Sequence, residues 1–204
     1  MDWTLRAMTG RKAMSPTLLS IPPELRALIF DFALTAPNPL VAFRLDPYQR
    51  DTYTEATQPA LTKVSRQLRH EAIPIFYASN TFILHTNSIK AEEARRWLQS
   101  ICEHLPLLQH IDLWVRYCAT HRDPPQGALR VSMHYDVRQD NWTVDREWGW
   151  VTVVKRPENV PEHAAQVVRA LAKVVQGKRR AEMTPEQYVY CTKAVMMIDE
   201  GSIV

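Results

Sequence analysis

Hydrophobic residues recur with a helical period at the start of the chain, in residues 20–34. Ser20, the prolines at 22 and 23, and Glu24 form a typical start signal, because a helix tolerates proline in its first turn. Four apolar side chains then have the i, i+3, i+4, i+7 spacing of one helical face: Leu25, Leu28, Ile29 and Phe32. The pattern predicts a short helix that ends before Pro37 and buries this stripe in its own domain.

Two further apolar residues of this helix, Phe30 and Leu34, fall off the stripe and share a second face. A helix that is apolar on two sides must bury both faces, either within its own domain or against a partner. The sequence leaves both alternatives open. We expect Phe30 and Leu34 to form an exposed docking face, and Leu25 and Leu68 to lie in the core.

Four more helices are predicted. The second begins near Pro59 and should kink or lose its last turn at Pro74. The third covers about 88–104, the fourth about 161–176 with Gly177 as its stop, and the last about 184–199 after a capping box at Thr184. The inward side of the third helix should carry five apolar residues: Ala94, Trp97, Leu98, Ile101 and Leu105.

Alternation of apolar and polar residues predicts strands at 111–115, 129–137 and 148–155. We expect these three to share an antiparallel sheet, with 81–85 as a candidate edge strand. Together the elements predict an α+β fold, in which an N-terminal helical unit packs on a small antiparallel sheet flanked by helices.

Composition is typical of a soluble globular protein, with 46% apolar and 23% charged residues among 204. The net charge of +3 is spread along the chain, which argues against a nucleic-acid partner. Three cysteines without a CxxC pair favour a reducing compartment, and no apolar run suggests a signal peptide or membrane span. We therefore expect an intracellular protein, cytoplasmic or nuclear, without a membrane partner.

Candidate chemistry is weak. The five glycines are too scattered for a nucleotide-binding loop. Zinc could use thiolates and imidazoles at Cys102, His104, His110, Cys118 and His121, but cysteines at apolar positions are more often core. His134, Asp136 and Asp140 could serve acid–base work, and Trp142, Trp148, Trp150 and Arg146 could stack nucleic-acid bases. We expect instead that the acid–base candidates form the solvated face of the hairpin and that the tryptophans pack in the sheet core. We expect no catalytic residue, metal or cofactor.

Four stretches between residues 21 and 82 resemble parts of the F-box-like domains of filamentous fungi. Residues 21–30 (IPPELRALIF) are similar to the opening "LP-x-E-L…I-F" helix, and residues 64–69 (VSRQLR) to the "V-C-R-x-W-R" helix. Residues 71–77 (EAIPIFY) and 80–82 (NTF) resemble the "EA-x-PIFY…N-x-F" ending of the fungal group. The resemblance covers about residues 18–86.

The resemblance implies an organisation and a partner. It implies an F-box-like helical domain at 18–86, from which the chain departs by an insertion at 37–58, and a C-terminal region that selects a substrate or partner. The sequence itself predicts a disordered leader at 1–17 and an α+β region at 87–204. The F-box-like helices would dock onto the Skp-type adaptor of a cullin-RING ubiquitin ligase. The implied adaptor-binding residues are Ile21, Pro22, Leu25, Ile29, Phe30, Leu34, Val64 and Leu68.

Two alternatives remain open. The chain could be a scaffold protein without a ligase, or a small enzyme with a site on the 129–155 hairpin. An adaptor pull-down would support the ligase hypothesis, whereas a deep polar pocket with a strongly perturbed acid or base would support the enzyme.

Overall fold

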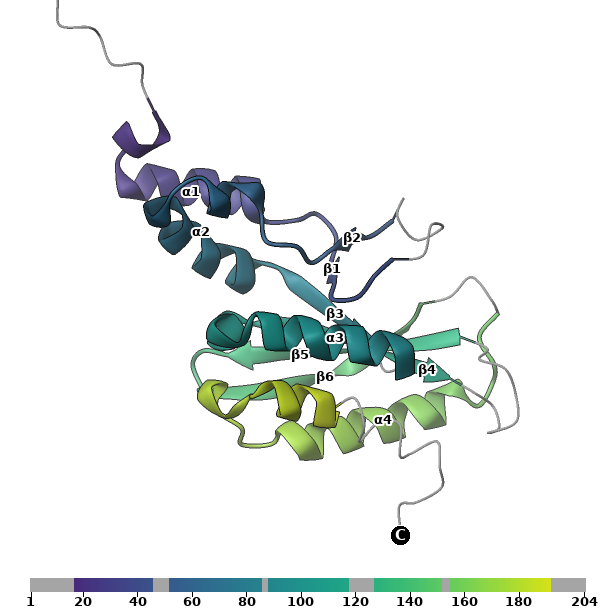
Figure 1. Ribbon diagram of the computed structural model, residues 1–204. Coiled ribbons are helices and arrows are strands. Elements are labelled where there is room, and N and C mark those ends of the chain that lie inside the picture. Colours follow the sequence, from purple (N-terminus) through teal and green to yellow (C-terminus); the bar gives the residue numbers. More distant parts are fainter. Residues whose placement is uncertain (1–16, 46–51, 86–87, 118–126, 152–154, 192–204) are drawn as a thin grey trace, which may run out of the picture.

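The computed structural model describes residues 17–45, 52–85, 88–117, 127–151 and 155–191 (Figure 1). The predicted leader, apart from Thr17, lies outside these ranges, as does the end of the predicted last helix. The helices are α1 (Pro23–Leu34), α2 (Arg66–Ser79), α3 (Ser88–Ser100) and α4 (Val160–Val175), and residues 185–191 are also helical. The strands are β1 (Leu40–Val41), β2 (Thr54–Glu55), β3 (Thr81–His85), β4 (His110–Tyr117), β5 (Gly127–Asp136) and β6 (Asn141–Trp150).

The strands form one six-stranded mixed sheet in the order β2-β1-β3-β4-β5-β6. The predicted α+β fold is confirmed, and the three strands expected to share a sheet do so as β4, β5 and β6, which pair antiparallel. Strand β3 differs from expectation, because it is internal and pairs parallel with both β1 and β4. Parallel neighbours are joined by long connections, so no local turn signal in the sequence announces them.

Strand β6 begins at Asn141, seven residues before the predicted start. The cause is an irregularity in the β5–β6 ladder, where Val131 pairs with Trp148 but Met133 pairs with Val144. Three residues of β6 (145–147) therefore face Ser132 alone, and this bulge interrupts the alternation that marks a strand in the sequence. Of the predicted strand, residues 152–154 lie outside the described ranges.

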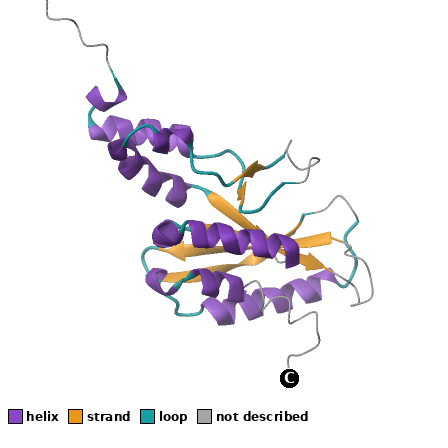
Figure 2. Cartoon of the chain, viewed as in Figure 1, coloured by secondary structure: helices purple, strands orange, loops and turns teal. Residues whose placement is uncertain are grey.

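One face of the sheet is covered by helices α3 and α4, which form a layer over it together with the C-terminal helical turn (Figures 1 and 2). Four of the five residues expected to point inward from α3 and the turn after it are buried, and Trp97 is half-buried. Helix α4 ends before Gly177, whose φ of 69° lies in the left-handed region that favours glycine.

The second face of the sheet carries a smaller apolar cluster: Val41, Phe43, Leu45, Ile83 and Trp114. Three of these residues come from the 37–58 segment, which also supplies the short strands β1 and β2. The segment thus extends the sheet by two strands and covers part of its second face, and leaves the rest of that face open.

Helices α1 and α2 stand side by side at one end of the sheet (Figure 1). Helix α2 begins later than predicted, at Arg66, because Ser65 caps it by accepting a hydrogen bond from the Leu68 amide at 3.1 Å. It continues through Pro74 to Ser79 without losing its last turn. A 3-10 helix, Ala60–Lys63, occupies the region where the sequence predicted its first turn.

Candidate functional site

The side of α1 that faces away from α2 is apolar and exposed. Four residues make up this surface, which we name the outer α1 face: Leu25, Leu28, Ile29 and Phe32. Phe32 is 92% exposed and Leu28 is 67% exposed. Large apolar side chains gathered at helical spacing on one face are a common mark of a protein-interaction surface.

The opposite side of α1 is buried and consists of Arg26, Phe30 and Leu34. The prediction that the Leu25 stripe lies inside is therefore wrong, and so is the prediction that Phe30 and Leu34 are exposed. At about 100° per residue the two sets are centred roughly 150° apart around the helix. Both sets have helical spacing, so periodicity alone could not say which of them faces α2.

Arg26 anchors α1 to α2 through a bidentate ion pair with Glu71. Its Nε donates to Glu71 Oε2 at 2.7 Å and its Nη2 to Oε1 at 2.6 Å, while Nη1 donates to the Ile21 carbonyl. The hydrogen bonds from Arg26 are the main reason why the pKa of Glu71 falls to about 2. Forked guanidinium–carboxylate pairs fix geometry as well as charge, so the two helices are held in one arrangement.

Asn80 ties the C-terminal ends of the same two helices together. Its Nδ2 donates to the carbonyls of Leu34 at 2.8 Å and Phe76 at 2.7 Å, and its Oδ1 accepts from the Ala36 amide at 2.7 Å. Carbonyls at a helix end have no partner within the helix, and here one buried side chain supplies the missing donors. Glu71 and Asn80, both in the quoted motif, thus hold the helix pair together.

The residues assigned to adaptor binding divide between surface and core. Leu25, Ile29, Val64 and Pro22 are exposed and Ile21 is half-buried, whereas Phe30, Leu34 and Leu68 are buried. The last three belong to the core of the helix pair in the free chain. Leu28 and Phe32 are surface residues that the apolar periodicity did not reveal. The buried residues Arg26, Phe30 and Leu34 follow a regular i, i+4, i+8 spacing of their own.

The β5–β6 hairpin brings His134 together with two residues of β6. His134 Nδ1 lies 3.0 Å from Asp145 Oδ1, and His134 Nε2 lies 2.9 Å from Thr143 Oγ1. This is the carboxylate–imidazole–hydroxyl order of an orienting acid, a base and a nucleophile. The other two acid–base candidates are structural: Asp136 accepts from the amides of Arg138 and Gln139 in the turn, and Asp140 accepts from the Tyr135 hydroxyl.

The tryptophans of the predicted stacking platform lie on the helix-covered face. Trp142 is buried against Tyr188, Trp150 packs edge-on to Tyr117, and Trp148 holds Arg156 over its ring. Arg146 is exposed on the bulge. These rings pack into the sheet core and do not form a platform.

The zinc candidates are scattered where they are described. Cys102 is exposed, His104 stacks on Tyr77, and His110 faces His134 across β4 and β5. Cys118 and His121 lie outside the described residues, and the described residues contain no group of three that could hold a metal ion.

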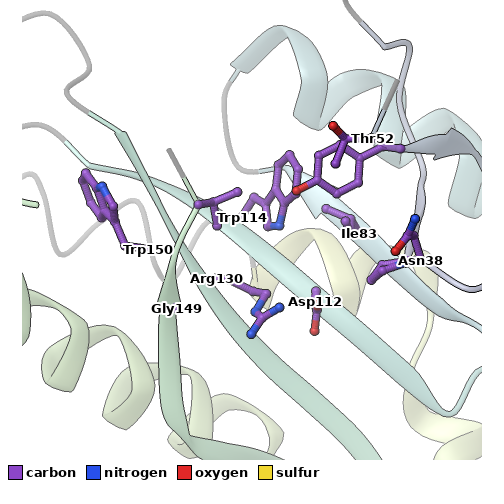
Figure 3. A pocket seen from close by; sticks show the side chains of 11 residues that line it. Asn38, Thr52, Ile83, Asp112, Trp114, Arg130, Gly149 and Trp150 are labelled. Carbon is purple, nitrogen blue, oxygen red and sulfur yellow. The ribbon is translucent and has the colours of Figure 1, made fainter. Parts of the chain in front are cut away.

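A pocket of about 340 Å³ opens on the second face of the sheet (Figure 3). Its floor is formed by strand residues Ile83, Asp112, Trp114, Arg130 and Gly149, and its rim by Asn38, Pro39, Thr52, Tyr53 and the chain at 150–151. A neighbouring pocket of about 430 Å³ shares Asp112 and contains His110, Ser132, His134 and Asp145. Burial raises the pKa of Asp112 and lowers that of His110.

Comparison with known proteins gives no relative: no protein-family model, no curated protein and no solved structure matches the chain. Among the described helices, none combines the length and apolar character needed to cross a membrane.

Proposed function

We propose that this chain is a non-enzymatic, F-box-like protein-interaction module. Its outer α1 face docks onto the Skp-type adaptor of a cullin-RING ubiquitin ligase, and the region after residue 86 holds the substrate. The observation that carries the proposal is the exposure of Phe32 and Leu28 on a helix whose other side is fully packed. The proposal includes an intracellular location, cytoplasmic or nuclear, because such ligases act there.

Two features support a docking role for this face. Full burial of an exposed large apolar side chain stabilises by about 1.5–3 kcal/mol, and Phe32 and Leu28 are the most exposed of the four. A partner would recover that free energy. Arg26–Glu71 and Asn80 hold α1 in one arrangement before any partner binds, so little ordering is needed on association.

Co-expression with the adaptor, followed by affinity capture and gel filtration, tests the proposal. The wild-type chain should co-elute with the adaptor. Leu28→Asp and Phe32→Asp should remain folded and lose the complex, because each puts a charge into an apolar contact. Val137→Asp is the matched control, since Val137 is an exposed apolar residue on the distant β5–β6 turn.

The scaffold alternative uses the same surface with another protein. A wild-type chain that fails to bind the adaptor would rule out the ligase role. The scaffold hypothesis then predicts that Phe32→Asp disrupts whichever complex the chain forms.

A small hydrolytic enzyme is the second candidate, and the His134–Asp145–Thr143 arrangement favours it. Hydrolysis of p-nitrophenyl acetate separates the two functions. A non-enzymatic chain should show the same rate for wild type, His134→Asn and the exposed control His70→Asn. A selective loss in His134→Asn and Asp145→Asn would favour the enzyme.

A further inference from the structure

The pocket between the 37–58 segment and the sheet contains a cation, Arg130, whose charge acts through space on the neighbouring Asp112 carboxyl. Arg130 is exposed in the floor of this pocket, and its guanidinium makes no hydrogen bond or ion pair with any described residue. Figure 3 shows it reaching into the same space as Asp112 and Trp114. An unpaired guanidinium inside a pocket is a strong donor for a carboxylate, which it can bind through two parallel hydrogen bonds.

Gly149 lies beside that guanidinium. Arg130 and Gly149 are directly opposite each other on β5 and β6. A Cβ added to Gly149 would lie 3.4 Å from Arg130 Nε and 3.5 Å from Nη2, so the guanidinium packs next to the glycine. A Cβ alone would make ordinary van der Waals contact with the guanidinium, whereas a longer side chain at 149 would reach toward the space that the guanidinium occupies.

The floor offers two more polar groups beside Arg130. Asp112 is 5% exposed and carries a carboxylate that can accept a hydrogen bond from a ligand as well as from Ser132. Trp114 lies opposite Arg130 on β4 and is 4% exposed. Its indole nitrogen is buried without an acceptor in the described part of the chain, and in Figure 3 it lies on the side of the ring toward Arg130. An unsatisfied buried donor costs free energy that a ligand acceptor would recover.

Apolar surface completes the pocket. Tyr53 packs edge-on against Trp114 with ring centroids 4.9 Å apart, and Ile83, Pro39 and the chain at Val151 line the same space. At about 340 Å³ the pocket is at the small end of the usual range for ligand sites, roughly 300–1,000 Å³. It suits one amino-acid residue better than a large cofactor.

We propose that this pocket binds the carboxyl-terminal residue of a peptide chain. The terminal carboxylate accepts hydrogen bonds from the Arg130 guanidinium, with the Trp114 indole N–H as a further donor. The last amide N–H of the peptide donates to Asp112, and the apolar side chain lies against Tyr53 and Ile83. The ligand thus presents an acceptor to each donor and a donor to the buried carboxylate.

The inference deepens the proposed function, because it assigns the substrate class to the region after residue 86. It rests on that function only in treating the bound chain end as part of a substrate. Titration of the isolated chain with small ligands needs no adaptor, so the two proposals fail separately. Loss of ligand binding leaves adaptor docking intact, and loss of adaptor binding leaves the pocket intact.

A matched pair of ligands tests the carboxylate: N-acetyl-L-phenylalanine and N-acetyl-L-phenylalaninamide, which differ only in the terminal group. Binding is followed in ¹H–¹⁵N correlation spectra through the Trp114 indole signal, assigned with Trp114→Phe. The acid should bind saturably, and the amide at least about tenfold more weakly, a difference of about 1.4 kcal/mol. Equal binding of acid and amide, or binding of neither, would overturn the proposal.

Variants test the residues. Arg130→Gln should weaken binding of the acid at least about tenfold, whereas Arg146→Gln, which removes the same charge from the exposed bulge, should leave it unchanged. An equal effect of the two variants would show a general charge effect and contradict the site. Gly149→Val, which places a larger side chain beside the guanidinium without removing it, should also weaken binding of the acid.

Phenylacetate separates a chain end from a free acid, because it has the ring and carboxylate but no amide N–H. It should bind more weakly than N-acetyl-L-phenylalanine, and Asp112→Asn should weaken only the latter. Circular dichroism confirms that this variant is folded. If phenylacetate binds as tightly and Asp112→Asn changes nothing, the pocket binds a free acid and the assignment to a peptide terminus is wrong.

Discussion

Phe30 and Phe32 lie two residues apart on α1, yet Phe30 is 0% exposed and Phe32 is 92% exposed. A separation of two residues turns the side chain by about 200° around a helix. One ring therefore packs in the core beneath α1, while the other stands in water on its outer face. The same short helix serves as core element and as candidate docking surface.

This relationship predicts opposite results for two matching substitutions. Phe30→Ala should lower the free energy of unfolding by about 3–5 kcal/mol, because it leaves a cavity in the core. Phe32→Ala should change the free energy of unfolding by no more than about 0.5 kcal/mol, because the Phe32 ring is almost fully exposed. Urea denaturation followed by circular dichroism measures both. Similar losses for the two variants would contradict the burial of one face alone.

The Arg26–Glu71 pair predicts a pH dependence of stability. The pKa of Glu71 in the folded chain is about 2, below its ordinary value of 4.5, mainly because Arg26 donates hydrogen bonds to its carboxylate. The stabilisation is therefore present above the ordinary pKa and is lost as the pH falls from 4.5 toward 2.

Glu71→Gln isolates this contribution. The wild type should be more stable than the variant near neutral pH by an amount that does not vary with pH there. The difference should shrink on acidification, because the protonated wild-type side chain then resembles glutamine. A difference that stays constant down to low pH would mean that the ionised pair does not anchor the helices.

Asn80 predicts a loss at the joint between the two helices. Asn80→Ala removes a side-chain amide that makes three hydrogen bonds. The Leu34 carbonyl and the Ala36 amide each lose the hydrogen bond that Asn80 makes to them. We expect thermal or urea unfolding to show a loss of roughly 1–3 kcal/mol. The neighbouring control Ser79→Ala, which breaks one exposed hydrogen bond to Asp31, should stay within about 0.5 kcal/mol of wild type.

Asp112 predicts the opposite pH dependence from Glu71. Burial raises its pKa above the ordinary value of 3.8, so the folded chain disfavours the charged carboxylate. The resulting penalty is absent below the ordinary pKa and develops as the pH rises through the raised one. Asp112→Asn should therefore be stabilised relative to wild type at neutral pH, and this gain should fall on acidification toward pH 3.8. A gain that grows on acidification would contradict the burial of a charged group.

The sequence predicted most elements because their signals are local. Strand β5 alternates almost without interruption, and α4 has a strong helical period that ends at Gly177. The parallel pairing of β3 could not be predicted, because its partners come from distant segments of the chain. The early start of β6 could not be predicted either, because a bulge interrupts its alternation.

Which face of α1 is buried could not be predicted from the sequence, for a different reason. Hydrophobic periodicity identifies the most apolar face of a helix. In α1 that is the exposed outer α1 face, which has four large apolar residues, whereas the buried side has two beside Arg26. The decisive residue is Arg26, which lies on the buried side and would ordinarily be expected in water. Its partner Glu71 is 45 residues away, so nothing near α1 reveals that the charge is paired. The Arg130 pocket was missed similarly, since its rim and floor come from distant segments.

The central claim is that the outer α1 face binds the adaptor, and isothermal titration calorimetry with the purified adaptor tests it most directly. Phe32→Ala should raise the dissociation constant at least about thirtyfold, as expected for an interface hot spot worth roughly 2 kcal/mol. The matched exposed variant Val137→Ala should leave it unchanged. Unaltered affinity of Phe32→Ala, or no binding by the wild type, would contradict the account.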